Sequence, residues 1–92
     1  MRVLVRALRP FSQALGAKDL ELERPEGETV EALIRHLAAE YPAFREHAID
    51  PGGGIELTLN IMVGGRPLGE HDLSNTLQDG DEVLLFMPLS GG

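Results

Sequence analysis

The chain contains no cysteine among its 92 residues. This absence excludes disulfides, thiolate metal sites and a cysteine nucleophile, so any sulfur chemistry must use sulfur that another molecule supplies. No stretch approaches the run of about 18 apolar residues that a membrane-spanning helix needs. Basic residues are scarce as well, since eight Lys and Arg against fifteen Asp and Glu give a formal charge of −7. Nucleic-acid phosphates require a basic footprint, so no nucleic-acid partner is expected. Because a long apolar run is missing, no membrane is expected as a partner either.

The amino-acid composition and the length of the chain fit one small globular domain. Hydrophobic residues make up 42% of the chain and charged residues 25%, close to the globular average. A length of 92 residues leaves no room for a second core. The first residues lead straight into a strand pattern, without the charged, apolar and small-residue succession of a secretion signal. We therefore expect a cytoplasmic protein, whose acidic surface suits steering toward a basic protein partner.

Four segments alternate apolar and polar residues with the period of two that is typical of strands. They cover residues 2–8, 19–24, 57–63 and 81–87. The first two predict an N-terminal hairpin. Gly64-Gly65 predicts a two-residue turn from the third strand into a short edge arm that contains Pro67. The residues predicted to face the core from the last two strands are Leu57, Leu59, Ile61 and Val63, together with Val83 and Leu85.

One amphipathic helix is predicted between the two pairs of strands. Apolar residues recur at helical spacing from Val30 to Tyr41, Thr29 stands at the N-cap position, and Pro42 ends the helix. Residues 43–56 show no period and contain a Pro-Gly-Gly-Gly stretch, which predicts a mobile crossover loop. Residues 72–77 are predicted to form a short helical turn.

This order of elements predicts an α+β domain with a mixed sheet covered on one face by one main helix. Placing the first and last strands side by side in the middle of the sheet gives the β-grasp arrangement of ubiquitin. The element order alone allows other topologies as well.

No catalytic or metal-binding constellation is visible. The three histidines, His36, His47 and His71, are scattered, and no second pair completes a ligand set, so no metal site is predicted. The glycines at 52–54 lack the following Lys-Ser or Lys-Thr and the helix start that a phosphate-binding loop needs. No Ser, His and Asp set suggests a nucleophilic triad.

The candidate site is the C-terminus, where Gly91 and Gly92 follow the last predicted strand. Glycine has no Cβ, so a groove in another protein can close around this backbone and reach the terminal carboxylate. We predict a domain over residues 1–87 and a flexible tail over residues 88–92. Pro88 lowers the entropy cost of inserting this tail, because it restricts its own conformations and those of its neighbour. The alternative is a noncatalytic interaction domain with an incidental, frayed end.

The segment from Leu77 to Gly92 combines Asp79-Gly80-Asp81-Glu82, an apolar strand and a Gly-Gly end. Upstream lie a helix start, Glu28-Thr29-Val30, and a turn, Val63-Gly64-Gly65-Arg66. Together these stretches resemble the MoaD-like sulfur carriers, the small subunit of molybdopterin synthase, over nearly the whole chain. The chain departs from that pattern at Met87-Pro88, where the family usually has two prolines.

The resemblance implies that Gly92, preceded by Gly91, carries the chemistry. A ubiquitin-activating-like adenylyltransferase would use ATP to adenylate the terminal carboxylate, and a persulfide donor would convert it to a thiocarboxylate. The molybdopterin synthase large subunit would then receive the tail. The chain would thus be a noncatalytic carrier subunit with no stably bound cofactor. Ubiquitin-like modifiers conjugated to lysines, and carriers for tRNA thiolation or thiamine synthesis, remain alternatives.

The predicted anchor for these partners is the sheet face away from the helix. If Val83 and Leu85 face the core, then Leu84 and Phe86 point outward, and Leu4 joins them from the first strand. An apolar group there would mark a protein-binding surface. The tail residues predicted to contact partners are Pro88, Leu89 and Ser90.

Overall fold

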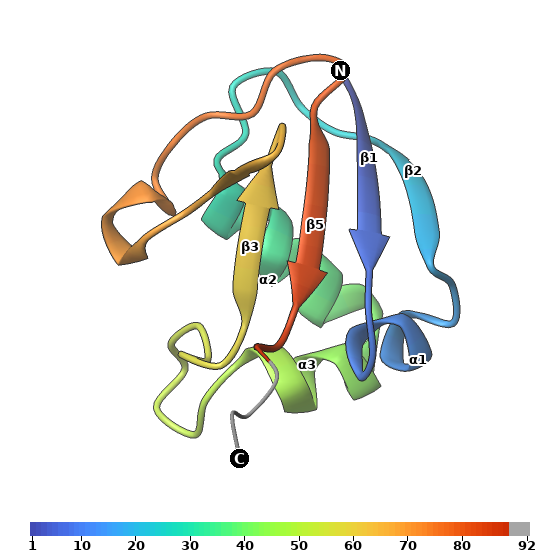
Figure 1. Cartoon of the computed structure of the whole chain (residues 1–92), viewed down its shortest axis with the longest axis vertical. Helices are drawn as coiled ribbons and strands as arrows, with labels where there is room; N and C mark the ends of the chain where they lie inside the picture. The colour runs from blue at the N-terminus through green and yellow to red at the C-terminus, as the bar shows by residue number, and fades with distance from the viewer. Residues whose placement is uncertain (89–92) are drawn as a thin grey trace.

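Five strands form one mixed sheet in the computed structural model, which describes residues 1–88 (Figure 1). They are β1 (Arg2–Ala7), β2 (Asp19–Glu23), β3 (Asn60–Val63), β4 (Arg66–Pro67) and β5 (Glu82–Phe86). Their order is β2-β1-β5-β3-β4, in which β1 and β5 are parallel neighbours and the other pairs are antiparallel. The prediction of an α+β β-grasp domain with both terminal strands inside the sheet is confirmed.

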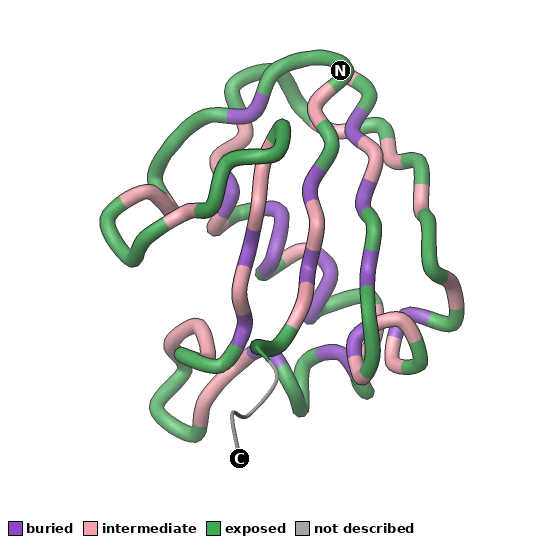
Figure 2. The backbone as a smooth tube through the Cα atoms, viewed as in Figure 1, coloured by how far each residue is buried: buried purple, intermediate pink, exposed green. Residues whose placement is uncertain are grey.

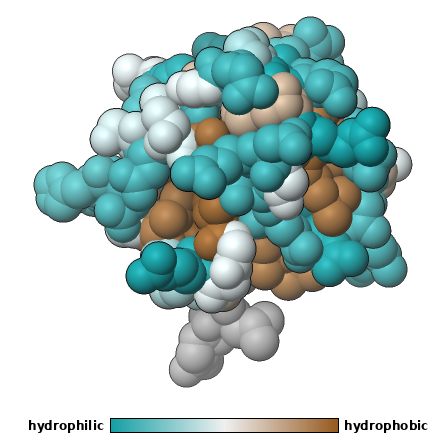
Figure 3. Space-filling view, turned by 90° about the horizontal axis from the view of Figure 1, so that it is seen from above, coloured by the Kyte–Doolittle hydropathy of each residue, from teal (hydrophilic) through white to brown (hydrophobic). Residues whose placement is uncertain are grey.

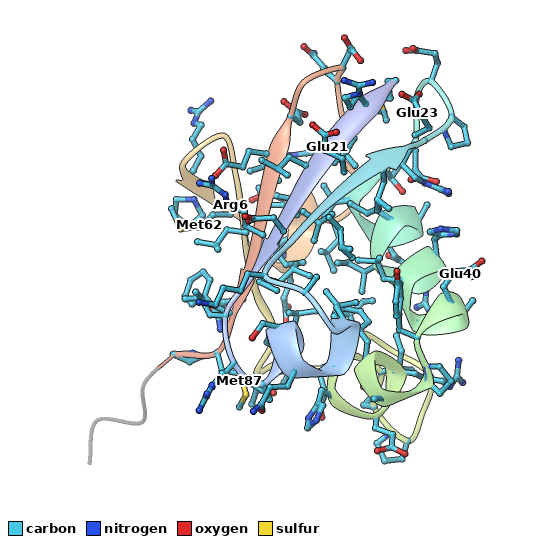
Figure 4. All side chains as sticks on the ribbon, turned by 90° about the vertical axis from the view of Figure 1, so that its right-hand side faces the viewer. Arg6, Glu21, Glu23, Glu40, Met62 and Met87 are labelled. Atoms are coloured by element: carbon cyan, nitrogen blue, oxygen red, sulfur yellow. The ribbon has the colours of Figure 1, made fainter. Side chains whose placement is uncertain are left out.

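The helices cover one face of this sheet and leave the other face open. The main helix is α2 (Val30–Glu40), and the shorter α1 (Phe11–Leu15) and α3 (Pro42–Ala48) lie near one end of it. Figure 4 shows the sheet nearly edge-on, with the helices on one side of the strands. Among residues 1–88, no helix combines the length and the hydropathy that crossing a membrane requires.

The core fills the space between the sheet and α2. Val83 and Leu85 of β5 are fully buried, as are Val3 and Val5 of β1. Buried positions alternate with more exposed ones along both strands, which Figure 2 shows as purple segments between pink and green ones. The alternation predicted for the terminal strands is therefore confirmed. From α2, the core receives Val30, Leu33, Ile34, Leu37 and Ala38.

The start of α2 is set by Thr29, as predicted. Its backbone is extended, with φ −84° and ψ 163°, and its hydroxyl accepts a hydrogen bond from the Ala32 N–H at 3.1 Å. That bond pairs one of the amides that the first helical turn leaves without a partner. Just upstream, the Arg24 guanidinium donates two hydrogen bonds to the Glu28 carboxylate, at 2.7 and 2.6 Å, and these raise the pKa of Arg24 above its usual range.

Replacing this cap, Thr29→Ala, is expected to lower the free energy of unfolding by about 1 kcal/mol, because the freed amide has no other side-chain partner. Urea unfolding followed by circular dichroism measures the loss. Thr58→Ala is the matched control, since Thr58 is exposed and lies in a turn. Equal losses in both variants would show that the cap contributes nothing.

The prediction of a loop over residues 43–56 is wrong for its first half, where α3 forms. Phe44 and Ala48 are four residues apart, so they share one helical face, and both are fully buried. The sequence pattern failed here because seven residues offer only this one apolar pair. Pro42 also has two roles: it ends α2, and it stands at the first position of α3, where a missing N–H costs nothing.

The segment between β1 and β2, which joins the two strands of the predicted hairpin, also contains a helix. In α1, Phe11 and Leu15 repeat the same four-residue spacing and are buried. Gly16 follows with φ 74°, a left-handed conformation that ends the helix. The ring of Phe11 meets that of Phe44 edge to face, with centroids 5.8 Å apart and an interplanar angle of 62°. One helical layer therefore contains α1 and α3 in contact.

The inward orientation predicted for Leu57 is wrong. β3 begins only at Asn60, and Leu57 lies in a preceding turn with 79% of its surface exposed. In that turn the Leu59 N–H donates to the Glu56 carbonyl at 3.1 Å. Leu59 and Ile61 are buried as predicted, and Val63 is partly buried. The alternation therefore holds for the strand but fails when it is extended back across the turn.

The hairpin between β3 and β4 agrees with the prediction. Gly64 and Gly65 have φ values of 59° and 81°, which is the pair of left-handed positions that a two-residue hairpin turn requires. Pro67 lies in β4, the edge strand of the sheet, as expected for a residue without an N–H. The short helical turn forms earlier than predicted, at Glu70–Asp72, where the Asp72 carboxylate accepts from the Gly69 N–H at 2.9 Å.

Candidate functional site

β5 carries the chain from the middle of the sheet to the start of the predicted tail. Phe86 is its last residue, and Met87 and Pro88 follow as exposed residues. The predicted reactive residues Gly91 and Gly92 lie outside the described residues, as do Leu89 and Ser90. The roles of these four residues, and the division into a domain and a flexible tail, stay predictions.

The face of the sheet away from the helices brings together apolar residues of three strands. In register, Leu84 of β5 lies between Arg6 of β1 and Met62 of β3, and Phe86 lies opposite Asn60. Leu4, Met62, Leu84 and Phe86 are all partly exposed, and we call them the open sheet face. Figure 4 shows Arg6 and Met62 on this side. Seen from above, Figure 3 shows hydrophobic side chains near its lower border, the side of this face.

Three of these residues were predicted from the sequence, and Met62 was missed. The signal for Met62 was available, because it alternates with Ile61 and Val63, which had been assigned to the core side. Leu4 lies at the edge of the group, since its register neighbours are Glu21 on β2 and Glu82 on β5. The strand pairing thus places Leu84, Phe86 and Met62 together and puts Leu4 among carboxylates.

Charged residues border the open sheet face on the side of β2. Arg6 forms ion pairs with Asp19 at 3.2 Å and with Glu82 at 3.1 Å, which link β2, β1 and β5. Exposed pairs of this kind contribute about 0–1 kcal/mol to stability. These charges are more important for choosing a binding partner, because fixed charges around an apolar centre favour a protein with complementary charges. Glu21 and Glu23 extend the acidic border along β2 (Figure 4).

Among residues 1–88, no three His, Asp or Glu side chains are grouped so that they could hold a metal ion. His47 is exposed, and its ring lies nearly perpendicular to that of Phe11, with the ring centroids 6.4 Å apart. His36 and His71 lie on other elements. Two surface hollows, of about 130 and 370 Å³, are lined by apolar side chains together with charged ones, which are Glu56 and Glu70 in the first and Arg66 and Asp72 in the second.

Comparison with known proteins gives the family. Residues 5–92 match the sequence model of the ThiS family. Small archaeal modifier protein 3 of Haloferax volcanii is 29% identical over 93 residues, which covers 100% of both chains. The structure of a putative molybdopterin converting factor, subunit 1, from Pyrococcus furiosus is 30% identical, with a TM-score of 0.76 over 97% of this chain and 99% of that one.

The crystal structure of small archaeal modifier protein 1 from Haloferax volcanii has a TM-score of 0.87 and covers 100% of both chains at 21% identity. At that identity the likeness concerns the fold alone. The family match, by contrast, spans nearly all of the chain, from the second half of β1 to the Gly-Gly end. The chain therefore belongs to the ThiS family.

Proposed function

We propose that this chain is a sulfur carrier that donates sulfur in molybdopterin biosynthesis through a thiocarboxylate at Gly92. The observation that carries the proposal is the family match, which runs through Gly92 itself. The molybdopterin branch is favoured by the 30% identity to a protein described as subunit 1 of a putative molybdopterin converting factor. The chain's lack of cysteine fits a carrier that receives its sulfur from elsewhere.

The chemistry begins with activation of the terminal carboxylate. Its oxygen attacks the α-phosphate of ATP, which forms an acyl adenylate and releases pyrophosphate. A persulfide anion then attacks the acyl carbon and displaces AMP, giving an acyl disulfide. A second thiol cleaves the sulfur–sulfur bond, which leaves the thiocarboxylate on Gly92 and a disulfide on the donor. Adenylation is needed because AMP is a far better leaving group than oxide.

Two protein partners follow from this chemistry, an ATP-dependent adenylyltransferase and a sulfur-accepting large subunit. Both must enclose Gly92. Residues 88–92 span about 16 Å when extended at about 3.3 Å per residue, and fixing their backbone costs about 5–10 kcal/mol. Binding energy must therefore come from the folded domain, and we assign it to the open sheet face. Because activation consumes ATP, we also propose a cytoplasmic location.

A modifier conjugated to lysines is the second candidate. It is favoured by the 29% identity to small archaeal modifier protein 3 over the whole of both chains. Activation of Gly92 would be the same, but a lysine amine would attack the acyl carbon and form an isopeptide bond. The acceptor is therefore the point at which the two candidates differ.

Mass spectrometry of the chain isolated from its native cells separates these candidates. A sulfur carrier gains about 16 Da at its C-terminus, because one oxygen is replaced by sulfur. A modifier leaves branched Gly-Gly remnants on lysines of other proteins. If neither product forms, the chain is an interaction domain and the proposal is wrong.

Phe86→Ala tests the open sheet face. Removing this partly exposed ring is expected to weaken binding to the adenylyltransferase by about 10- to 100-fold, because aromatic anchors carry much of the energy of an interface. The measurement is the KM for the chain in ATP–pyrophosphate exchange. Tyr41→Ala is the matched control, since Tyr41 is a partly buried aromatic residue that ends α2 on the covered side of the sheet. An unchanged KM for Phe86→Ala would remove this face from the interface.

A further inference from the structure

Large hydrophobic side chains are exposed at three places in residues 1–88. They are Leu8, Leu57 and Met87, with 55%, 79% and 40% of their surfaces exposed. The three belong to segments far apart in the sequence, after β1, before β3 and after β5. None of them is part of the open sheet face.

The sheet topology brings these three side chains to one end of the sheet. β1 and β5 are parallel, so both strands finish there, and β3 is antiparallel to β5, so it starts there (Figure 1). The Leu8 N–H donates to the Leu85 carbonyl at 2.9 Å, and Asn60, at the start of β3, lies opposite Phe86. We call Leu8, Leu57 and Met87 the apolar collar, because they lie in the three segments that meet at the end of the sheet where β5 finishes.

Backbone hydrogen bonds on both sides of Leu57 hold this residue in its exposed position. On one side of it, the Glu56 N–H donates to the Ala48 carbonyl of α3 at 2.7 Å. On the other side, the Leu59 N–H closes the turn onto the Glu56 carbonyl at 3.1 Å. Leu57 also lines the surface hollow of about 130 Å³, together with Leu59 and Leu68. An apolar side chain is thus held outward at the rim of a hollow whose lining also includes Glu56, Asn60 and Glu70.

We propose that the apolar collar is a docking surface for the partner protein that encloses the tail. The collar would contact the rim of that partner's cleft, and this rim would be apolar. The inference rests on the proposed function. Its occupant follows from chain length, because Pro88 to Gly92 span only about 16 Å at about 3.3 Å per residue. A protein that encloses Gly92 must bring the mouth of its cleft down to the start of the tail, where the collar lies. A rim of this chemistry would remove these three exposed apolar side chains from water, which is favourable.

Leu57→Asp tests the collar, because it places a charge where the rim would sit, on a side chain that is 79% exposed. Gln78→Asp is the matched control, since it adds the same charge at an exposed position before the opposite end of β5. Each purified variant is incubated with ATP and an extract of the native cells. The rate of formation of the C-terminal product is then followed by intact mass and by Gly-Gly remnants.

For Leu57→Asp, we expect the concentration of chain that gives half-maximal rate to rise at least about 10-fold, while the maximal rate stays the same. Gln78→Asp is expected to match the wild type, and equal urea midpoints confirm that all three proteins are folded. If Leu57→Asp also matches the wild type, the collar inference is wrong while the proposed function stands. If the wild type itself gives no product, the proposed function fails and the collar inference fails with it.

Discussion

Deletion of Gly92 is expected to lower formation of the C-terminal thiocarboxylate, or of the isopeptide if the chain is a modifier, by at least about 100-fold. The deletion leaves a carboxylate on Gly91, but this group stops about 3.3 Å short of its normal reach. An adenylating site holds its nucleophile against the α-phosphate, and displacement by even about 1 Å can cost about 100-fold in rate. The measurement is the intact mass of the chain recovered from its native cells.

Two controls separate this effect from loss of fold. Gln78→Ala keeps the whole tail and is expected to react at close to the wild-type rate, because Gln78 is exposed and lies before the opposite end of β5. Thermal unfolding of the Gly92 deletion is expected to match that of the wild type, because the buried core ends at Leu85 of β5. Normal charging of the deleted protein would show that the terminal carboxylate at Gly92 is not the reactive group.

Local signals in the sequence were sufficient for most of the sheet and for α2. Strand alternation depends on neighbours two residues apart, and it correctly assigned Val83 and Leu85 to the core and Leu84 and Phe86 to the other side. The Thr29 cap likewise depends on an interaction three residues along the chain. Such features were predictable because the physics that produces them is local.

Features that depend on strand order were not predictable from local patterns. The Arg6 side chain pairs with Asp19, 13 residues away, and with Glu82, 76 residues away, because β1 lies between β2 and β5. No spacing rule connects residues so far apart before the sheet order is known. The apolar collar also depends on the arrangement of the strands, since Leu8 and Met87 come to one end of the sheet only because β1 and β5 are parallel.

Short helices were missed for a different reason. Two apolar residues do not define a period, so α1 and α3 gave no amphipathic signal, although each buries an aromatic residue. The pattern also gave no warning that Pro42 would start a helix as well as end one. Tertiary packing between Phe11 and Phe44 supplies what the local sequence lacks.

Phe44→Ala is accordingly expected to lower the free energy of unfolding by about 3–5 kcal/mol, the range for deleting a buried aromatic ring. Phe44 is 0% exposed, and its loss leaves a cavity beside the Phe11 ring. Domains of this size have about 5–15 kcal/mol of stability in total, so the variant loses a large share of it. Urea unfolding measures the change, and Phe44→Leu, which leaves a smaller cavity, serves as a second variant that stays folded.

The matched control is Phe86→Ala, which removes a ring of the same size from the open sheet face. Because Phe86 is only partly buried, its loss is expected to cost less stability than that of Phe44 while weakening partner binding more. If Phe44→Ala lowers the free energy of unfolding by less than about 0.5 kcal/mol, the range for surface substitutions, the buried position of Phe44 in α3 is contradicted. The crossover loop predicted from the sequence would then be favoured. The two substitutions therefore distinguish a residue that stabilises the fold, Phe44, from a residue that binds the partner, Phe86.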